Sequence, residues 1–360
     1  MQDGGYLRFE AAGLAVLPGL KGAIPFRLGQ VQAELAGVLV IPVRHVDVFL
    51  APEFGFLGVG RDVVRAGAAL VDARDVHAAI EARIHRHDYP EQRLQETITD
   101  GERLLAVGGE RVGQVNGLTV VNLGDYQFGF PVRVTATAHA GEEGLLDIER
   151  EVEMSGPIHD KGVLILQSYL SALFAHVAPL ALNAAVVFEQ EYSGVEGDSA
   201  SCAEFYALLS ALSGLPLRQG IAVTGALNQH GEMQPVGAIN EKIEGFFGSC
   251  ERLGLDGAQG VLIPQRNRRQ LMLSPRVVDA VAAGRFHIHT AGHAGEGMEL
   301  LTGRPFGSLG PHGYPADTVL GRAQATLLAY RRACTQASGS HRPPNSRWRS
   351  GPPRGESRRR

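Results

Sequence analysis

Strand-like and helix-like segments alternate between residues 105 and 303, and this alternation is the feature that most limits the folds open to the chain. Three runs of alternating apolar and polar residues, separated by glycine turns, occupy 105–150 and predict a β-meander. A meander followed by alternating helices and strands predicts an α+β domain of about 200 residues. The expected elements are a helix over 158–176, a strand over 182–189, a helix over 199–212, a strand over 220–225, a hairpin turn over 228–235, a helix over 239–252, a strand over 259–264, helical segments near 266–273 and 276–283, a strand over 285–289 and a last helix near 300.

The segments on either side of this domain differ from it in composition. Residues 1–71 are rich in Gly, Ala, Val and Leu and form a separate N-terminal region whose pattern indicates neither a clear fold nor a function. Residues 72–104 carry a charged helical pattern, which predicts a helical connector that Pro90 divides into two helices. Residues 335–360 are dense in Arg, Pro, Gly and Ser and predict a disordered tail.

Composition argues against several classes of protein. A net charge of -4 and a pI near 6.4 do not indicate a nucleic-acid or anionic-membrane partner, and the Arg-rich tail comes without an aromatic platform for nucleic acid. The three cysteines, Cys202, Cys250 and Cys334, lack the paired spacing of disulfide frameworks and zinc knuckles. Because no run of about 18 apolar residues and no leader pattern occurs, we expect a cytoplasmic protein without a membrane partner.

The sequence YSGVEGDSAS places Ser199 between a predicted strand and a predicted apolar helix. Glycines permit a sharp bend there, and the N-terminus of the helix offers free backbone N–H groups, which suits a nucleophile beside an oxyanion site. The same residues also fit a helix cap, with Asp198 or Ser199 as the capping residue, or with Ser201 and Glu204 at the spacing of a capping box. The motif alone leaves both readings open, and caps are the commoner of the two.

A serine nucleophile needs a base, and the sequence offers a lysine for it. A GxSxG motif is absent, and His230 lies in a predicted exposed turn. Lysine occurs only at 21, 161 and 242, and all other basic residues are arginines, which cannot lose their proton. Lys242 lies early in the predicted amphipathic helix PVGAINEKIEGFF, where burial would lower its pKa toward the working pH. The alternative is an ordinary lysine on the surface of that helix.

Three motifs, GVEGDSAS, GIAVTG and QPVGAINEKIEG, with Ser199 and Lys242 separated by 43 residues, resemble the Ser-Lys dyad block of Lon proteases, both bacterial Lon-related and archaeal. The similarity extends to ERVGQVNGLTVVNLGDYQFGFP, DIEREVEMSGPIHDKGVLILQSYL and GVLIPQRN, and therefore covers 105–303. The resemblance implies the α+β Lon proteolytic fold and a serine-type endopeptidase. In that reading Ser199 attacks the scissile carbonyl and Lys242 takes the hydroxyl proton.

The resemblance also implies supporting residues and partners. Thr224 matches a threonine that hydrogen-bonds the lysine, while Glu196 and Asp198 match acidic positions beside the serine. Members of the family form hexameric rings, act on unfolded or damaged proteins, and use ATP to thread them. We therefore expect a homo-oligomer with protein substrates.

The chain departs from the family pattern in its nucleotide-binding part. No GxxxxGK[ST] loop occurs, because no glycine is followed by lysine, so we expect no cofactor on this chain and ATP only through the family. Residues 1–14 and 72–100 resemble ATPase-side segments of Lon-related proteins, so 1–71 reads as a remnant of a truncated or rearranged relative. A separate ATPase is the partner that this would require.

Other motifs carry less weight. His85 with His87 and His287 with His289 are HxH pairs that lack a third ligand nearby in sequence, so we predict no metal site. His159 and Lys161, in GPIHDKG, are assigned to a helix start and not to catalysis. The competing function is a catalytically idle Lon-like module for assembly, which would have no need of Ser199, Thr224 and Lys242 together.

Overall fold

A computed structural model describes residues 41–42, 70–71, 73–124 and 126–340, and the chain divides into two units, 1–94 and 95–360. In the first unit, strands β1 (Ile41–Pro42) and β2 (Leu70–Val71) pair antiparallel, and helix α2 (Ala73–His87) follows. Helix α3 (Tyr89–Thr99) begins in the first unit and ends in the second. The two predicted helices are present, with the break at Asp88 and Pro90 in the first turn of α3, while their role as a connector stays a prediction. Most of 1–71 lies outside the described residues.

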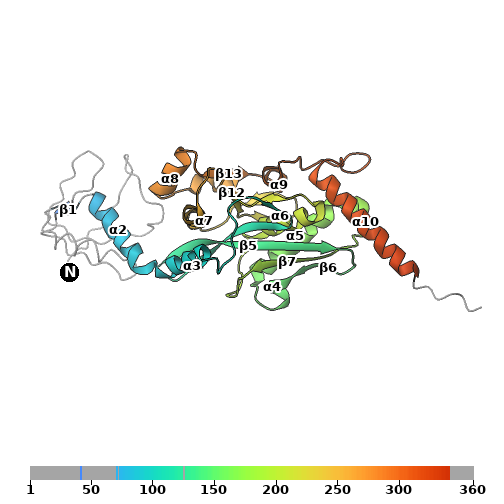
Figure 1. Cartoon of the computed structure of the whole chain (residues 1–360), viewed down its shortest axis with the longest axis horizontal. Helices are drawn as coiled ribbons and strands as arrows, with labels where there is room; N and C mark the ends of the chain where they lie inside the picture. Colours follow the sequence, from blue (N-terminus) through green and yellow to red (C-terminus); the bar gives the residue numbers. More distant parts are fainter. Residues whose placement is uncertain (1–40, 43–69, 72, 125, 341–360) are drawn as a thin grey trace, which may run out of the picture. The chain divides into compact units, whose positions relative to one another are not determined.

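The second unit is organised around a seven-stranded mixed sheet (Figure 1). In spatial order the strands are β13 (His287–Ala291), β12 (Gly260–Pro264), β9 (Ile221–Val223), β4 (Gln114–Asn122), β5 (Gln127–His139), β7 (Asn183–Glu189) and β6 (Gly144–Asp147). The first four run parallel to one another, β5 is antiparallel to both of its neighbours, and β6 runs parallel to β7. The predicted α+β class is confirmed. The predicted meander over 105–150 is only partly correct: β4 and β5 pair antiparallel, but β6 pairs parallel with β7, which lies between β5 and β6.

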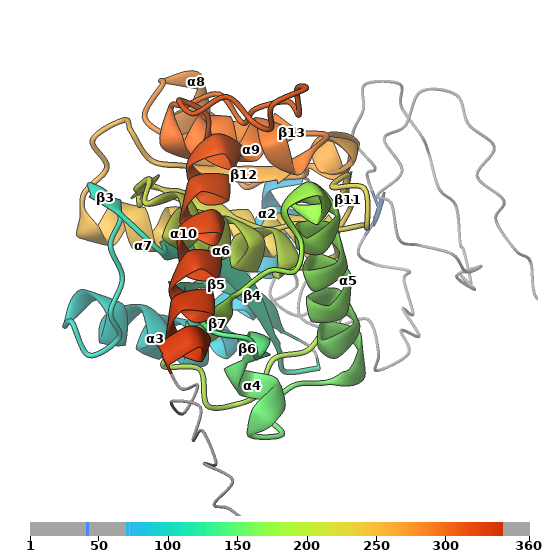
Figure 2. The ribbon, with the colours of Figure 1, turned by 90° about the vertical axis from the view of Figure 1, so that its right-hand side faces the viewer.

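Helices cover both faces of this sheet (Figure 2). They are α4 (Ile148–Glu151), α5 (Pro157–Leu173), α6 (Ser201–Ser213), α7 (Ile239–Leu253), α8 (Pro275–Ala282), α9 (Ala294–Thr302) and α10 (Val319–Ser340), with 3-10 turns η3 (Ala175–Val177) and η4 (Gln265–Gln270). Two short antiparallel pairs complete the unit: β3 (Glu110–Arg111) with β8 (Leu217–Arg218), and β10 (Ala226–Leu227) with β11 (Met233–Gln234).

The sheet separates two apolar cores, because neighbouring residues of a strand face opposite sides. In β12, Leu262 belongs to the core formed with α5, α6, α9 and α10, while Val261 and Ile263 belong to the core formed with α7 and α8. Helix α6 is almost wholly buried, which explains its continuous apolar sequence. Helices α6 and α7 therefore lie on opposite faces of the sheet.

Several boundaries differ from the sequence predictions for identifiable reasons. The strand expected over 285–289 begins at His287, because the N–H of Arg285 bonds to the carbonyl of Ala280 and closes α8. The helix expected near 266–273 is the 3-10 turn η4, and the helix expected to reach residue 176 ends at Leu173 with a separate 3-10 turn behind it. The hairpin at 228–235 forms between β10 and β11.

Helix α10 was not predicted, and it packs on α6 through Val319, Leu320, Ala323 and Leu327. It continues to Ser340, so residues 335–340 are helical where disorder was predicted, and 341–360 lie outside the described residues. Among the helices in the described parts of the chain, none combines the length and the apolar character needed to span a bilayer.

Candidate active site

The predicted nucleophile, Ser199, lies in the turn that enters α6. Gly194 and Gly197 have φ values of +90° and +87°, a left-handed conformation that favours glycine and bends the chain sharply. The carbonyl of Ser199 accepts hydrogen bonds from the N–H of Gly225 at 2.8 Å and from Oγ1 of Thr224 at 3.2 Å. These bonds divert the carbonyl from the helix, so α6 begins at Ser201 and not at Ser199 as predicted.

The helix-cap reading of this segment is wrong. The N-cap residue of α6 is Ala200, and no side chain caps the helix. The hydroxyl of Ser201 accepts a hydrogen bond from the N–H of Leu227 and donates one to the carbonyl of Asp198, both at 2.9 Å. Glu204 does not complete a capping box but faces His159. Neither Asp198 nor Ser199 is therefore occupied as a cap.

Lys242 reaches Ser199 from the first turn of α7. Its Nζ lies 2.8 Å from Oγ of Ser199 and 3.2 Å from Oγ1 of Thr224, in hydrogen-bond contact with both. The lysine is 4% exposed and Thr224 is fully buried, so the surface-lysine reading is wrong. Burial lowers the pKa of Lys242 to about 8, and the charge of Asp198 opposes this shift.

Close packing at a glycine fixes where Lys242 starts. Gly129 of β5 lies so near the first turn of α7 that a Cβ on it would clash with the carbonyl of Glu241 and approach Cα of Lys242 to 2.6 Å. Ala238, the residue before α7, has a φ of 52°, an uncommon conformation for a residue with a Cβ. The backbone around the lysine is thus held from two sides.

The two acidic residues of the motif lie in different places. Asp198 is near enough to Lys242 to raise its pKa, and Gly162 of α5 packs against it, since a Cβ there would lie 3.2 Å from Cβ of Asp198. Glu196 is exposed and lies against Gly156, at the wall of a shallow hollow of about 410 Å³. This hollow is lined by residues 153–156 and 192–196, just ahead of Ser199 in the chain.

Comparison with known families adds an independent line of evidence. Residues 193–296 match the family model of the Lon protease (S16) C-terminal proteolytic domain, and this range includes Ser199, Thr224 and Lys242. The chain carries a Lon-type proteolytic domain. Outside 193–296 the Lon-type domain is continued by the strands and helices that complete its sheet, from β4 onward.

Relatives of the Lon-type domain occur in bacteria and archaea. The chain is 41% identical over 224 residues, 62% of its length, to the "Putative Lon protease homolog" of Escherichia coli (strain K12), and 39% identical over 236 residues, 65% of its length, to the protein of the same name in Haemophilus influenzae. It is 31% identical over 243 residues, 64% of its length, to the "Archaeal Lon protease" of Pyrococcus abyssi. The matches span 38%, 39% and 22% of these relatives, so the chain corresponds to a part of each.

The structure groups a second set of polar side chains that the sequence analysis missed. Asp147, His159 and Glu204 meet in the interior, although they lie on three different elements, and only their folding together identifies them. The HxH pairs gain no third ligand within the described residues: His287 bonds through Nε2 to the carbonyl of Gly257, and His85 with His87 lies on helix α2.

Proposed function

We propose that the Lon-type domain is a serine endopeptidase in which Ser199 is the nucleophile and Lys242 is the general base. The single observation that carries this proposal is the 2.8 Å contact between Nζ of Lys242 and Oγ of Ser199, with the lysine 4% exposed. A lysine with a pKa of about 8 has a substantial neutral fraction near neutral pH, and only the neutral amine has the lone pair that accepts a proton. The membership of residues 193–296 in the Lon proteolytic family supports the same assignment.

In the proposed acylation step, Oγ of Ser199 bonds to the carbonyl carbon of the peptide and its proton passes to Nζ of Lys242. The carbon–nitrogen bond of the substrate then breaks, and Lys242 returns the proton to the leaving amine, so the lysine is neutral again. Thr224 orients the lysine, because its hydroxyl accepts a hydrogen bond from Nζ while it donates one to the carbonyl of Ser199. One N–H of the Lys242 amine thus bonds to the hydroxyl of Thr224, and the lone pair of Nζ remains directed at Oγ of Ser199.

In the proposed deacylation step Lys242 again acts first as a base and then as an acid, with water in place of Ser199 as the nucleophile. A water molecule loses a proton to Lys242 and attacks the ester, and the proton then returns to Oγ of Ser199, which leaves the acid product and the free enzyme. We assign stabilisation of the negatively charged intermediate to backbone N–H groups in the turn before α6, where the helix dipole is positive. Asp198 would tune the base, since its charge raises the pKa of Lys242.

We propose that the substrate is an extended, unfolded polypeptide that lies in the hollow beside the Ser199 turn. Two chain segments that line the hollow are joined by backbone hydrogen bonds. The N–H of Val195 bonds to the carbonyl of Met154, and the N–H of Gly156 bonds to the carbonyl of Val195. Tyr192, 80% exposed, offers an aromatic surface at the same hollow. An exposed aromatic ring and extended backbone suit a segment without tertiary structure.

We further propose a ring-shaped homo-oligomer that works with an ATPase carried on another chain. The resemblance to Lon proteases is the basis of this proposal. The matches span 38% and 39% of two of the relatives, so the assembly and the ATP dependence of a whole protein are proposals that rest on the resemblance.

The decisive experiment is cleavage of labelled casein by the purified chain, with and without ATP, for the wild type, Ser199→Ala and Lys242→Arg. Ser171→Ala and Lys161→Arg are matched controls, because both residues are exposed and lie outside the dyad and the hollow. We expect cleavage by the wild type and both controls, and none by the two dyad variants. Cleavage by Ser199→Ala would refute the proposal, and a folded wild type that cleaves nothing under any condition would favour the idle assembly module.

A further inference from the structure

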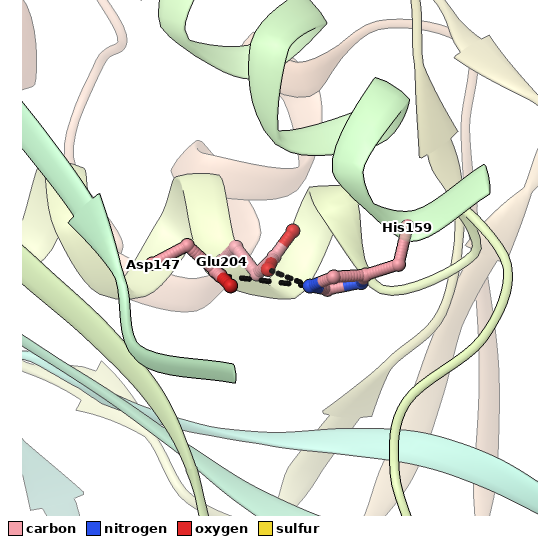
Figure 3. A group of neighbouring side chains, drawn as sticks. All are labelled: Asp147, His159 and Glu204. Carbon is pink, nitrogen blue, oxygen red and sulfur yellow. Dashed lines mark ion pairs between the residues drawn. The ribbon is translucent and has the colours of Figure 1, made fainter. Parts of the chain in front are cut away.

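The buried side chains of Asp147, His159 and Glu204 form a compact group on the face of α6 that looks toward α5 (Figure 3). Nε2 of His159 lies 3.5 Å from Oδ2 of Asp147 and 3.5 Å from Oε1 of Glu204. The three side chains are only 1–2% exposed. Within the described part of the chain this is the one group of three residues whose ligand atoms all approach one another within 4.8 Å.

The atoms that face each other in this group have no hydrogen-bond partners. Nε2 of His159, Oδ2 of Asp147 and Oε1 of Glu204 are all buried and unsatisfied, although buried polar atoms are almost always paired. The other carboxylate oxygen of Asp147 accepts a hydrogen bond from the N–H of Arg150 at 2.9 Å, which fixes the side chain as the cap of α4. The atoms that lack hydrogen bonds therefore face one another across 3.5 Å, and the side chain of Asp147 is held in place.

The separations within the group fit metal coordination better than hydrogen bonding. A nitrogen–oxygen hydrogen bond is about 2.7–3.2 Å long, and 3.5 Å exceeds that range. Two ligands on a tetrahedral cation, each bonded at about 2.1 Å, lie about 3.4 Å apart. Both distances from His159 therefore match the edges of such a tetrahedron.

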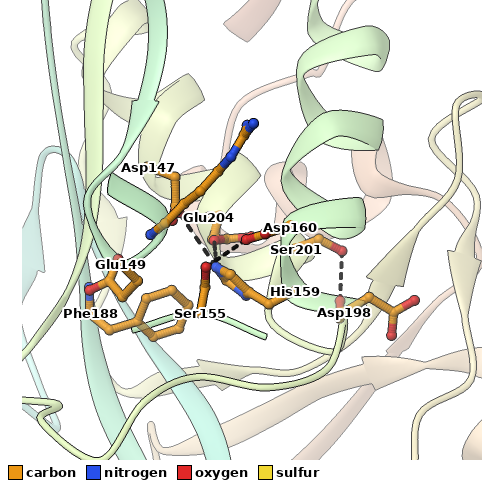
Figure 4. Close-up of polar contacts among 10 residues, drawn as sticks. Asp147, Glu149, Ser155, His159, Asp160, Phe188, Asp198, Ser201 and Glu204 are labelled. Atoms are coloured by element: carbon orange, nitrogen blue, oxygen red, sulfur yellow. Dashed lines mark hydrogen bonds and ion pairs between the residues drawn. The ribbon is translucent and has the colours of Figure 1, made fainter. Parts of the chain in front are cut away.

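The group lies among further carboxyl groups (Figure 4). Glu149 adds a further buried carboxylate, with Oε1 accepting from the N–H of Phe188 and Oε2 without a partner. Although burial by itself lowers the pKa of His159, the neighbouring carboxylates raise it to about 9, and burial raises the pKa of Glu204 to about 8. The ring of Phe188 packs edge-on against the imidazole at 5.5 Å and holds its orientation.

We propose that Asp147, His159 and Glu204 bind a divalent transition-metal ion, with Zn²⁺ as the ion that fits best. One imidazole nitrogen and two carboxylate oxygens are ligands that Zn²⁺ prefers, whereas Mg²⁺ and Ca²⁺ take six or more oxygen ligands. The site is separate from the proposed dyad, and it stands or falls without the peptidase assignment.

The ion would act by joining three elements at the entrance of α6. Asp147 ends β6, His159 lies in the first turn of α5, and Glu204 lies in the first turn of α6. In that same turn the hydroxyl of Ser201 donates a hydrogen bond to the carbonyl of Asp198, as Figure 4 shows. A metal ion bound to Glu204 would therefore also restrain the neighbouring turn that carries Ser199. The role is structural, and the three ligands are positioning residues with respect to catalysis.

The test is a titration of the chelator-treated full chain with ZnCl₂, followed by calorimetry and by thermal unfolding. We expect one Zn²⁺ per chain at this site and a rise in the unfolding midpoint by about 5 °C at saturating Zn²⁺. Glu204→Gln and Asp147→Asn keep the volume of the side chains and should each weaken that binding by about 100-fold or more. The double variant His287→Gln/His289→Gln, which removes the partly exposed HxH pair, is the matched control and should bind as the wild type does.

The unfolding midpoint of each variant is also measured without metal, so that a folding defect is not mistaken for the loss of a metal ligand. A Glu204→Gln chain that unfolds cooperatively and no longer gains stability from Zn²⁺ supports the site. If the wild type binds no stoichiometric Zn²⁺, the group is a charge-paired imidazolium between two carboxylates, and the proposal is wrong. Undiminished binding by both Glu204→Gln and Asp147→Asn would place the ion elsewhere and would equally overturn it. Casein cleavage does not enter these readouts, so failure of the metal site and failure of the peptidase proposal are distinguishable.

Discussion

Gly245 of α7 packs directly against the backbone carbonyl of Gly129 in β5, so closely that a Cβ on Gly245 would overlap that oxygen. Glycines on both partners allow the helix backbone to rest on the strand backbone without side chains between them. Lys242 lies one turn earlier on the same helix. The height of the lysine above the sheet is therefore set by a contact between two backbones.

Replacing Gly129 by alanine should move Lys242 away from Ser199. The new Cβ would clash with the carbonyl of Glu241, so α7 must shift, which we expect to lower the free energy of unfolding by about 1–3 kcal/mol. Casein cleavage should fall at least about tenfold even at temperatures where the variant is folded. Gly108→Ala is the control, because no atom lies within 4 Å of the added Cβ, and it should leave both quantities unchanged. An active, stable Gly129→Ala would contradict this account of the packing.

The peptidase activity should depend on pH through Lys242. Since only the neutral amine accepts the serine proton, kcat/KM should rise about tenfold per pH unit below pH 8 and level off above it. Asp198→Asn removes the charge that raises the pKa of the lysine, so the rising limb should move to lower pH. Glu196→Gln alters an exposed carboxylate in the hollow and should leave the limb in place. A pH profile that is identical in wild type and Asp198→Asn would show that Lys242 does not limit the rate.

Lys242 should also cost the protein stability below pH 8. Its pKa is lowered from 10.5 in the unfolded chain to about 8 in the fold, so the unfolded state binds more protons between these values and stability rises with pH across that window. Below pH 8 the cost is present in full, at most about 3.5 kcal/mol at about 1.4 kcal/mol per pKa unit.

The inactive variant Lys242→Met tests this directly, because its side chain is apolar and of similar length. Urea unfolding at pH 7 should show it to be more stable than the wild type, and the difference should shrink toward pH 10. Lys161→Met, at an exposed lysine, should show no such trend. A Lys242→Met chain that is less stable at pH 7 would mean that the ammonium is well accommodated by its surroundings.

Thr224 should affect turnover more than substrate binding. Thr224→Val keeps the shape of the buried side chain but removes both the acceptor for Lys242 and the donor for the carbonyl of Ser199. The loss of about one hydrogen bond that orients Lys242 predicts a kcat about tenfold lower, with little change in KM. Thr224→Ser retains the hydroxyl and should recover most of the rate. Equal activity of the serine and valine variants would remove Thr224 from the mechanism.

The sequence was sufficient for the parts of the site that local motifs encode. Ser199, Thr224 and Lys242 each belong to a short motif, and the structure brings all three within hydrogen-bond distance. What the motifs could not settle was whether Ser199 capped a helix. That depended on the neighbouring strand segment, since the N–H of Gly225 and the hydroxyl of Thr224 take the Ser199 carbonyl out of the helix.

Features that arise only from tertiary packing were missed. The buried residues of α10 recur at helical spacing, but Gly321 in its first turn weakens the signal. That glycine is required by a close approach, because a Cβ there would overlap the carbonyl of Pro315. His159 was assigned to a helix start, which is correct for α5, yet its burial beside Asp147 and Glu204 comes from elements distant in the sequence.

The division of the second unit into two apolar cores bears on when the dyad forms. Residues next to Ser199 in α6 belong to one core, while those around Lys242 in α7 belong to the other, across the sheet. The contact between Nζ of Lys242 and Oγ of Ser199 therefore requires both layers to be folded. A chain with only one layer in place would lack the proposed dyad, so the dyad is a product of the complete fold.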